Sequence, residues 1–167
     1  MIQSDHPLAA VLVALLLWCA STDLAQRRIA NAAVVAVAAL YPLAFALGTM
    51  PGPLWLGLAF ASAIFALGLA GFALGAVGGG DVKLAAALGL WAGSSDLAGF
   101  VVVTALAGAV LSILILATRN LPIGHYFAGP LQAGPQTGGH AATGESVPYG
   151  VALAAGGLWI AYGLIAA

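Results

Sequence analysis

Long apolar runs separated by short polar or glycine-rich connections dominate the chain. Six apolar segments can be marked along its 167 residues: 7–24, 30–49, 53–77, 82–93, 97–118 and 148–166. About 20 consecutive apolar residues form a helix long enough to cross the hydrocarbon core of a bilayer. The pattern therefore predicts an all-α, polytopic membrane protein with about six transmembrane helices, forming a single domain over residues 1–167.

Two stretches depart from this pattern. The fourth segment is short, and Gly93 to Asp96 read as a turn followed by the start of the next helix. Such a segment is tolerated at membrane depth only where protein or a water-filled cavity surrounds it. Residues 119–147 are rich in Gly, Pro, Thr, Gln and His and lack apolar periodicity. They are predicted to form one long polar loop.

The composition supports the membrane interpretation. Hydrophobic residues make up 63% of the chain and charged residues only 5%, against roughly 25% charged residues in an ordinary soluble domain. The single cysteine, Cys19, excludes an intramolecular disulfide and a cysteine-rich zinc module, and it is interpreted as a small apolar residue of a retained first helix. His125 and His140 lack a supporting ligand cluster, so no metal site is expected. No nucleic-acid partner is expected either.

The four basic residues predict the orientation in the membrane. With six alternating spans, they all fall on one face: Arg27, Arg28, Lys83 and Arg119. Lys and Arg that flank transmembrane helices stay in the cytoplasm. This face, with the polar loop, is therefore predicted to be cytoplasmic, and Asp5, Asp96 and both chain termini are predicted to lie outside.

Asp23 and Asp81 share the predicted cytoplasmic end of the helices. A carboxylate at the centre of a transmembrane helix costs roughly 2.5–3.5 kcal/mol, so its presence needs a reason. Three simple reasons stay open. Asp81 could be the N-cap of the fourth segment, Asp23 could pair with Arg27 one helical turn later, and either could lie in interfacial water without a chemical role.

Together the two acids could hydrolyse a peptide bond. One ionised carboxylate activates water, while one protonated carboxyl hydrogen-bonds the carbonyl and protonates the leaving nitrogen. Two carboxyls a few ångströms apart provide both states near neutral pH, because like charges in a poorly solvated site cannot easily coexist. The pair requires that the first and fourth segments are neighbours.

Glycines surround Asp81. Gly71, Gly75 and Gly79 recur every fourth residue, which predicts a smooth strip for close helix packing. The run Gly78, Gly79 and Gly80 directly precedes the acid. Glycines here are expected to adopt backbone conformations closed to other residues and to leave room for an extended peptide beside Asp81.

Three separated motifs resemble those of the type IV prepilin peptidase family. "GGGDVK" resembles its GxGD motif through Gly78, Gly80, Asp81 and Lys83. "STDLAQRRIAN" resembles its first motif through Asp23, Arg27, Arg28, Ile29 and Asn31, with Ala30 in place of the usual proline. "VPYG" resembles the entrance of its final helix through Pro148, Tyr149 and Gly150. The motifs occur in the expected order and span most of the chain.

The resemblance implies an intramembrane aspartic endopeptidase of the bacterial inner membrane that removes leaders from prepilins and pseudopilins at the cytoplasmic face. Asp23 and Asp81 would alternate as general base and general acid, without a metal or organic cofactor. The chain lacks the amino-terminal zinc-binding cysteines of longer members, so it resembles the short branch associated with Flp/Tad-type pili. That branch is expected to cleave without methylating. Contacts with the bilayer and with pilus or secretion machinery are also implied.

Several alternatives stay open. Lys83 could lower the charge cost of the acids or face lipid headgroups, and Arg27 and Arg28 are better interpreted as topology anchors than as substrate contacts. The polar loop could contact the leader or the machinery, or it could be a disordered connector. Competing functions are a nonenzymatic membrane assembly subunit and a proton-coupled transporter. A presenilin-like protease shares GxGD, but the Pro-Ala-Leu signature is absent.

Overall fold

The computed structural model describes residues 6–119 and 148–166. These residues form six helices, α1 (His6–Gln26), α2 (Asn31–Ala46), α3 (Leu54–Ala73), α4 (Gly79–Ser94), α5 (Leu97–Arg119) and α7 (Tyr149–Ala166). No strand occurs in these two ranges, which confirms the all-α prediction. Four helices, α1, α3, α5 and α7, are long and apolar enough to cross a membrane, and α2 is a shorter apolar helix. Apart from Arg119, the predicted polar loop at 119–147 lies outside the described residues.

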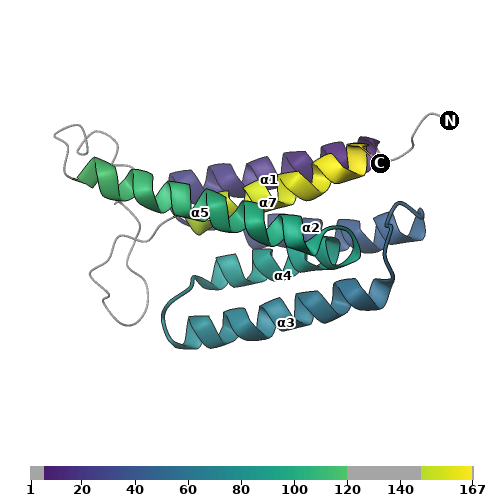
Figure 1. The fold of residues 1–167 in the computed structure, drawn as a ribbon, viewed down its shortest axis with the longest axis horizontal. Coiled ribbons are helices and arrows are strands. Elements are labelled where there is room, and N and C mark those ends of the chain that lie inside the picture. Colours follow the sequence, from purple (N-terminus) through teal and green to yellow (C-terminus); the bar gives the residue numbers. More distant parts are fainter. Residues whose placement is uncertain (1–5, 120–147, 167) are drawn as a thin grey trace.

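The helices run roughly along the long axis of an elongated bundle (Figure 1), with α4 at its centre. Helix α4 packs against α2, α3, α5 and α7, whereas α1 packs against α2 and α7. Its 16 residues span roughly 24 Å, less than the hydrocarbon thickness of a bilayer. The short helix α4 is enclosed by protein, because four helices pack around it, and this agrees with the surroundings predicted for the fourth segment.

Aromatic side chains join α2 to α4. Trp91 of α4 is fully buried, and its indole Nε1–H donates to the carbonyl oxygen of Val37 on α2 at 3.1 Å. The Trp91 ring meets Tyr41 edge to face with centroids 5.6 Å apart, and the Tyr41 hydroxyl hydrogen-bonds the Ser94 hydroxyl. These contacts satisfy the polar atoms of three buried side chains, so they fix the register of α2 against α4 without an unpaired group.

The predicted glycine strip is wrong as a single helix face. Helix α3 ends at Ala73, Gly75 adopts a positive φ of 72° in the following turn, and Gly79 belongs to α4. The close packing of α3 on α4 depends on other glycines. A Cβ at Gly57 would lie 2.6 Å from the Leu90 carbonyl oxygen, and one at Gly93 would lie 2.8 Å from that of Leu56. The prediction from glycine spacing was wrong for a simple reason. Residues four positions apart share a helix face only if they all belong to the same helix.

Asp96 connects α4 to α5 at the end of α4 opposite Asp81. Its carboxylate accepts the Gly99 backbone N–H at 2.9 Å and the Trp159 indole N–H at 2.9 Å. These two donors hold the pKa of Asp96 below its usual range. Asp96 therefore caps α5 and links it to α7, which agrees with the predicted start of the next helix. The predicted turn is wrong at Gly93 and Ser94, which belong to the last turn of α4.

Candidate active site

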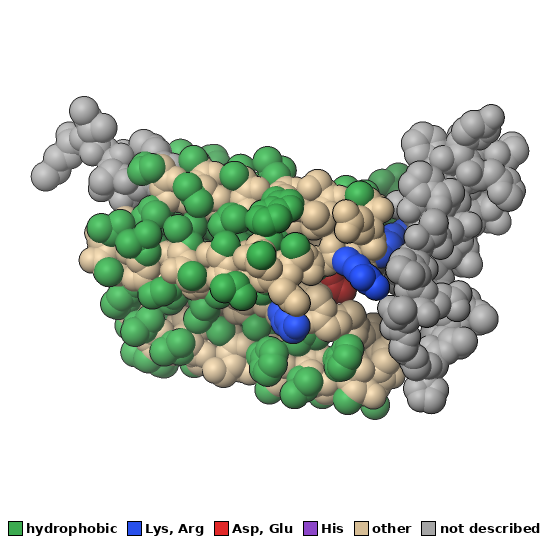
Figure 2. Space-filling view, turned by 180° about the vertical axis from the view of Figure 1, so that it is seen from behind, with side chains coloured by type: hydrophobic (Ala, Val, Ile, Leu, Met, Phe, Trp, Pro, Cys, Tyr) green, Lys and Arg blue, Asp and Glu red, His purple; other side chains and the backbone are tan. Residues whose placement is uncertain are grey.

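One end of the bundle collects the charged residues that the sequence singled out. Because the helices alternate in direction, the end of α1 and the starts of α2, α4 and α7 lie at this end (Figure 1). Figure 2 shows acidic surface there, between lysine and arginine side chains, while the described helices otherwise present mostly hydrophobic surface. The described acids at this end are Asp23 and Asp81.

Asp23 lies in the last turn of α1 and is held by the backbone of α7. Its side chain is only 5% exposed, and its Oδ2 accepts the Gly150 N–H at 2.9 Å. The neighbouring Val151 N–H donates to the Pro148 carbonyl oxygen at 3.2 Å, so it belongs to the same helix start beside the carboxylate. Helix α1 ends directly afterwards, since Arg27 adopts a left-handed φ of 52° and its N–H donates to the Asp23 carbonyl oxygen. Both the helix end and the neighbouring helix start therefore fix Asp23.

Asp81 lies in the first turn of α4 and not at its N-cap. The N-cap is Gly78, and the helix begins at Gly79. The partly buried Asp81 carboxylate folds back and accepts the Gly78 N–H, which satisfies one of the donors that a helix start leaves unpaired. The alternative that Asp81 is the N-cap is wrong because α4 starts two residues earlier.

The three glycines before Asp81 leave space for neighbouring groups, and none of them adopts a positive φ angle. Among the described residues, positive φ angles occur at Arg27, Gly48 and Gly75, so the expectation for 78–80 is wrong. A Cβ at Gly78 would lie 2.9 Å from Asp81 Oδ2, and a Cβ at Gly80 would lie 3.4 Å from the Ile29 Cβ. The absence of these side chains lets the carboxylate and the α1–α2 link approach α4 closely.

Ile29 joins the surroundings of the two acids. A Cβ at Gly150 would lie 3.0 Å from Ile29 Cδ1, so this side chain packs against the first turns of both α4 and α7. Sequence reasoning matched Ile29 to a motif but did not include it among the site residues. An apolar side chain in a short link between two helices was the available signal, because such a residue needs a place to be buried.

The surroundings of the two acids are shared, because Ile29 packs against Gly80, next to Asp81, and against Gly150, whose N–H donates to Asp23. The charge of Asp23 acts on Asp81, and the charge of Arg27 acts on Asp23. The predicted pairing of Asp23 with Arg27 and the predicted acid pair therefore stay predictions, and they do not exclude each other. Helices α1 and α4 meet here through their shared neighbours α2 and α7. An arrangement of two carboxyls, backbone donors and one nearby guanidinium can activate water and protonate a leaving group.

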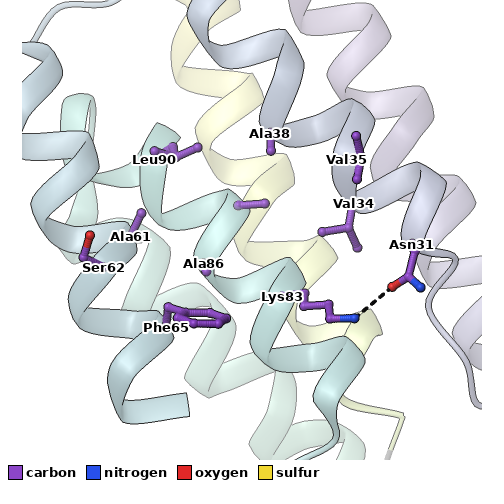
Figure 3. Close-up of a pocket in the computed structure, with 11 residues that line it drawn as sticks. Asn31, Val34, Val35, Ala38, Ala61, Ser62, Phe65, Lys83, Ala86 and Leu90 are labelled. Carbon is purple, nitrogen blue, oxygen red and sulfur yellow. Dashed lines mark hydrogen bonds between the residues drawn. The ribbon is translucent and has the colours of Figure 1, made fainter. Parts of the chain in front are cut away.

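Lys83 and Asn31 form a separate contact beside a groove. Lys83 Nζ donates to Asn31 Oδ1 at 3.2 Å (Figure 3). Lys83 follows Asp81 by two positions, about 200° around the helix, so the two side chains leave α4 on nearly opposite sides. The groove between α2, α3 and α4 has a volume of about 550 Å³ and is mostly apolar. It is lined by Asn31, Val34, Val35, Ala38, Ala61, Ser62, Phe65, Lys83, Ala86, Ala87 and Leu90.

The contact between Lys83 and Asn31 is expected to contribute little to stability. In a double-mutant cycle of Lys83→Met and Asn31→Ala, the coupling free energy should be below about 1 kcal/mol, because the bond is solvent-exposed. The cycle would be measured by reversible unfolding in mixed micelles. A coupling of several kcal/mol would contradict this expectation and would show that the bond holds α2 to α4.

The other candidate ligands do not form a metal site in the described part of the chain. Residues 6–119 and 148–166 contain no group of three or more His, Cys, Asp or Glu side chains that could hold a metal ion. Cys19 is fully buried in the core, as expected for a small apolar helix residue. His125 and His140 lie outside the described residues.

The match to a known family covers the residues of two of the three motifs. The model of the type IV leader peptidase family matches residues 10–113, which is more than half of the chain and includes Asp23 and Asp81. Pro148, Tyr149 and Gly150 lie beyond the matched residues. Neither the curated proteins nor the solved structures gave a match.

Proposed function

The chain belongs to the type IV leader peptidase family, and we propose that it is an intramembrane aspartic endopeptidase in which Asp23 and Asp81 are the catalytic residues. The observation that carries this proposal is that Ile29 packs against both Gly80, next to Asp81, and Gly150, whose N–H donates to Asp23, so the two acids share one end of the bundle. Asp23 and Asp81 are 58 positions apart in the sequence. Their helices, α1 and α4, are linked in the bundle because both pack against α2 and α7. Two interacting carboxyls next to backbone donors suit general acid and base catalysis.

The reaction is hydrolysis of one peptide bond. The ionised acid takes a proton from water, and the oxygen attacks the scissile carbonyl carbon while the protonated acid hydrogen-bonds the carbonyl oxygen. The tetrahedral intermediate then collapses as the leaving nitrogen receives a proton and the C–N bond breaks. The products are a leader with a new carboxyl terminus and a pilin with a free amine. No electron transfer is involved, so the two acids and water balance the reaction.

The substrates are proposed to be prepilins and pseudopilins of the Flp type, cleaved without methylation. The family supports prepilin substrates in general. The assignment to Flp-type substrates and to cleavage without methylation depends on the resemblance of the chain to the short branch of the family. The proposed location is the bacterial inner membrane, with the acids near the cytoplasmic face beside Arg27, Arg28 and Lys83. Pilus or secretion machinery is a further proposed partner.

Leader cleavage by the purified full chain tests this function. The protein in lipid nanodiscs would be incubated with a Flp-type prepilin from the same genome and a methyl donor, and the products would be analysed by mass spectrometry. We expect two fragments whose masses sum to the precursor plus one water, with an unmodified pilin amine. A methylated amine would contradict the assignment to the short branch. Intact precursor with several such prepilins would favour the nonenzymatic assembly subunit.

A proton-coupled transporter is less compatible with the distribution of polar groups. The described acids lie at the two ends of the bundle, Asp23 and Asp81 at one and Asp96 at the other. A proton relay would need ionisable or polar groups along the path between them. The buried residues of α4 between these ends are mostly apolar, including Leu84, Leu88 and Trp91. This core favours chemistry at one end over transport through the bundle.

A further inference from the structure

Asp23 and Asp81 differ in their exposure and in the backbone N–H groups near their carboxylates. Asp23 is 5% exposed, and its Oδ2 accepts the Gly150 N–H of the neighbouring helix α7 at 2.9 Å. Asp81 is more exposed, and the backbone group that acts on its carboxylate is the Gly78 N–H at the start of its own helix. A hydrogen bond donated to a carboxylate favours its ionised form. The backbone of α7 therefore favours charge on Asp23.

The donor to Asp23 belongs to the first turn of α7. The first four N–H groups of a helix lack intrahelical partners, and the helix dipole places partial positive charge there. Asp23 Oδ2 lies 2.9 Å from one of these groups, that of Gly150. Burial by itself disfavours a charged carboxylate, and the amides of the helix start offset this cost. Their attraction for the carboxylate is stronger where water is excluded, as it is around Asp23.

Gly150 makes this approach possible. A Cβ at this position would lie 2.8 Å from Asp23 Oδ2 and 2.9 Å from its Cγ, closer than such atoms approach without displacement. It would also lie 3.0 Å from Ile29 Cδ1, so an added side chain meets both neighbours. We expect any other residue at position 150 to displace the carboxylate from the amides of α7.

We propose that the first turn of α7 holds Asp23 as the ionised general base and leaves Asp81 as the protonated general acid, with Gly150 as the positioning residue. This inference rests on the proposed function and assigns the order of proton transfers within it. Water gives its proton to Asp23 as its oxygen bonds to the scissile carbon. Asp81 gives its proton to the leaving nitrogen as the C–N bond breaks. Transfer of one proton from Asp23 to Asp81 then restores the starting state.

Other charged or titratable groups near Asp23 are few among the described residues. Asp81 faces it from α4, Arg27 follows it at the end of α1, and Cys19 precedes it by one turn. On α7, the Tyr149 ring lies against Gly108 of α5. The contribution of α7 to Asp23 is therefore carried by its backbone amides, which do not titrate.

Gly150→Ala tests the proposal, with Gly163→Ala as the matched control. Both are the same change in α7, but an added Cβ at Gly163 meets nothing within 4 Å. Gly150→Ala should reduce kcat for leader cleavage about tenfold at neutral pH with little change in KM, because the base loses its ionised form and its position. The acidic limb of the pH–rate profile should move up by about one pH unit, and the basic limb should stay. Gly163→Ala should keep both limbs.

Three results would overturn the proposal. In Gly150→Ala, the acidic limb of the pH–rate profile could stay in place, or the basic limb could move in its stead. In Gly163→Ala, kcat could fall as much as it does in Gly150→Ala. If Gly150→Ala does not fold, Val151→Pro removes the neighbouring N–H from the first turn of α7, where proline is tolerated, together with its bond to the Pro148 carbonyl oxygen. It should move the same limb in the same direction, and an unmoved limb counts against the proposal. A wild-type chain without cleavage would refute the proposed function itself, which is a different outcome.

Discussion

Replacing either Asp23 or Asp81 with asparagine is expected to reduce leader cleavage by about 10³-fold or more, because general acid–base catalysis contributes on this scale and each acid has its own role. Asparagine keeps the size and can accept a hydrogen bond, so the Gly150 N–H and the Gly78 N–H keep a partner. The substitution removes only the ability to take or give a proton. Cleavage would be followed by gel shift and mass spectrometry after co-expression with a Flp-type prepilin.

Asp96→Asn is the matched control for this experiment. Asp96 is an acid of the same chain at the opposite end of α4, where it caps α5 and accepts the Trp159 indole. The control should keep its cleavage rate, since Asp96 is remote from both carboxyls. Full cleavage by either Asp23→Asn or Asp81→Asn, at equal protein level, would refute the two-acid mechanism.

Trp91→Ala is expected to cause the largest loss of stability of any single truncation in the core, on the order of 3 kcal/mol or more. The side chain is fully buried between α2 and α4, and its loss leaves a cavity. The variant also loses the hydrogen bond to Val37 and the edge-to-face contact with Tyr41. The free energy of unfolding would be measured by reversible denaturation in mixed micelles.

Trp55→Ala provides the comparison for this loss. Trp55 lies near the start of α3 and is 65% exposed, so the same truncation removes few packing contacts. Its free energy of unfolding should stay within about 0.5 kcal/mol of the parent. Equal effects at both positions would show that the loss comes from the general removal of an indole and not from the α2–α4 contact.

Much of the helix arrangement could be predicted from the apolar pattern. The six segments correspond to the six described helices, and their ends differ by a few residues, as at Ala73, where the third segment was extended to 77. The shared end of Asp23 and Asp81 followed from alternating helix direction and from the four basic residues. These features are local or require only that consecutive helices reverse direction, so they need no knowledge of which helices touch.

Contacts between distant segments could not be predicted in this way. The strip of Gly71, Gly75 and Gly79 suggested one packing face, but the helix ends within it, and α3 meets α4 through Gly57, Gly68, Gly89 and Gly93. The Gly78 to Gly80 run suggested an unusual backbone, yet α4 begins inside it. A glycine has two uses, conformational freedom and small size, and only the surroundings show which one applies.

The sequence alone determined the class of the protein and indicated the residues that we propose to carry its chemistry. Apolar runs of bilayer length require helices in a membrane, and the rare acids among them narrowed the candidates to Asp23 and Asp81. Only the tertiary structure decided how the acids differ. The Gly150 N–H reaches Asp23 across 127 positions of sequence, and Ile29 packs against both Gly80 and Gly150. Such contacts depend on how several helices pack together. The packing of a helix against its neighbours decides which side chains meet the free N–H groups at its start.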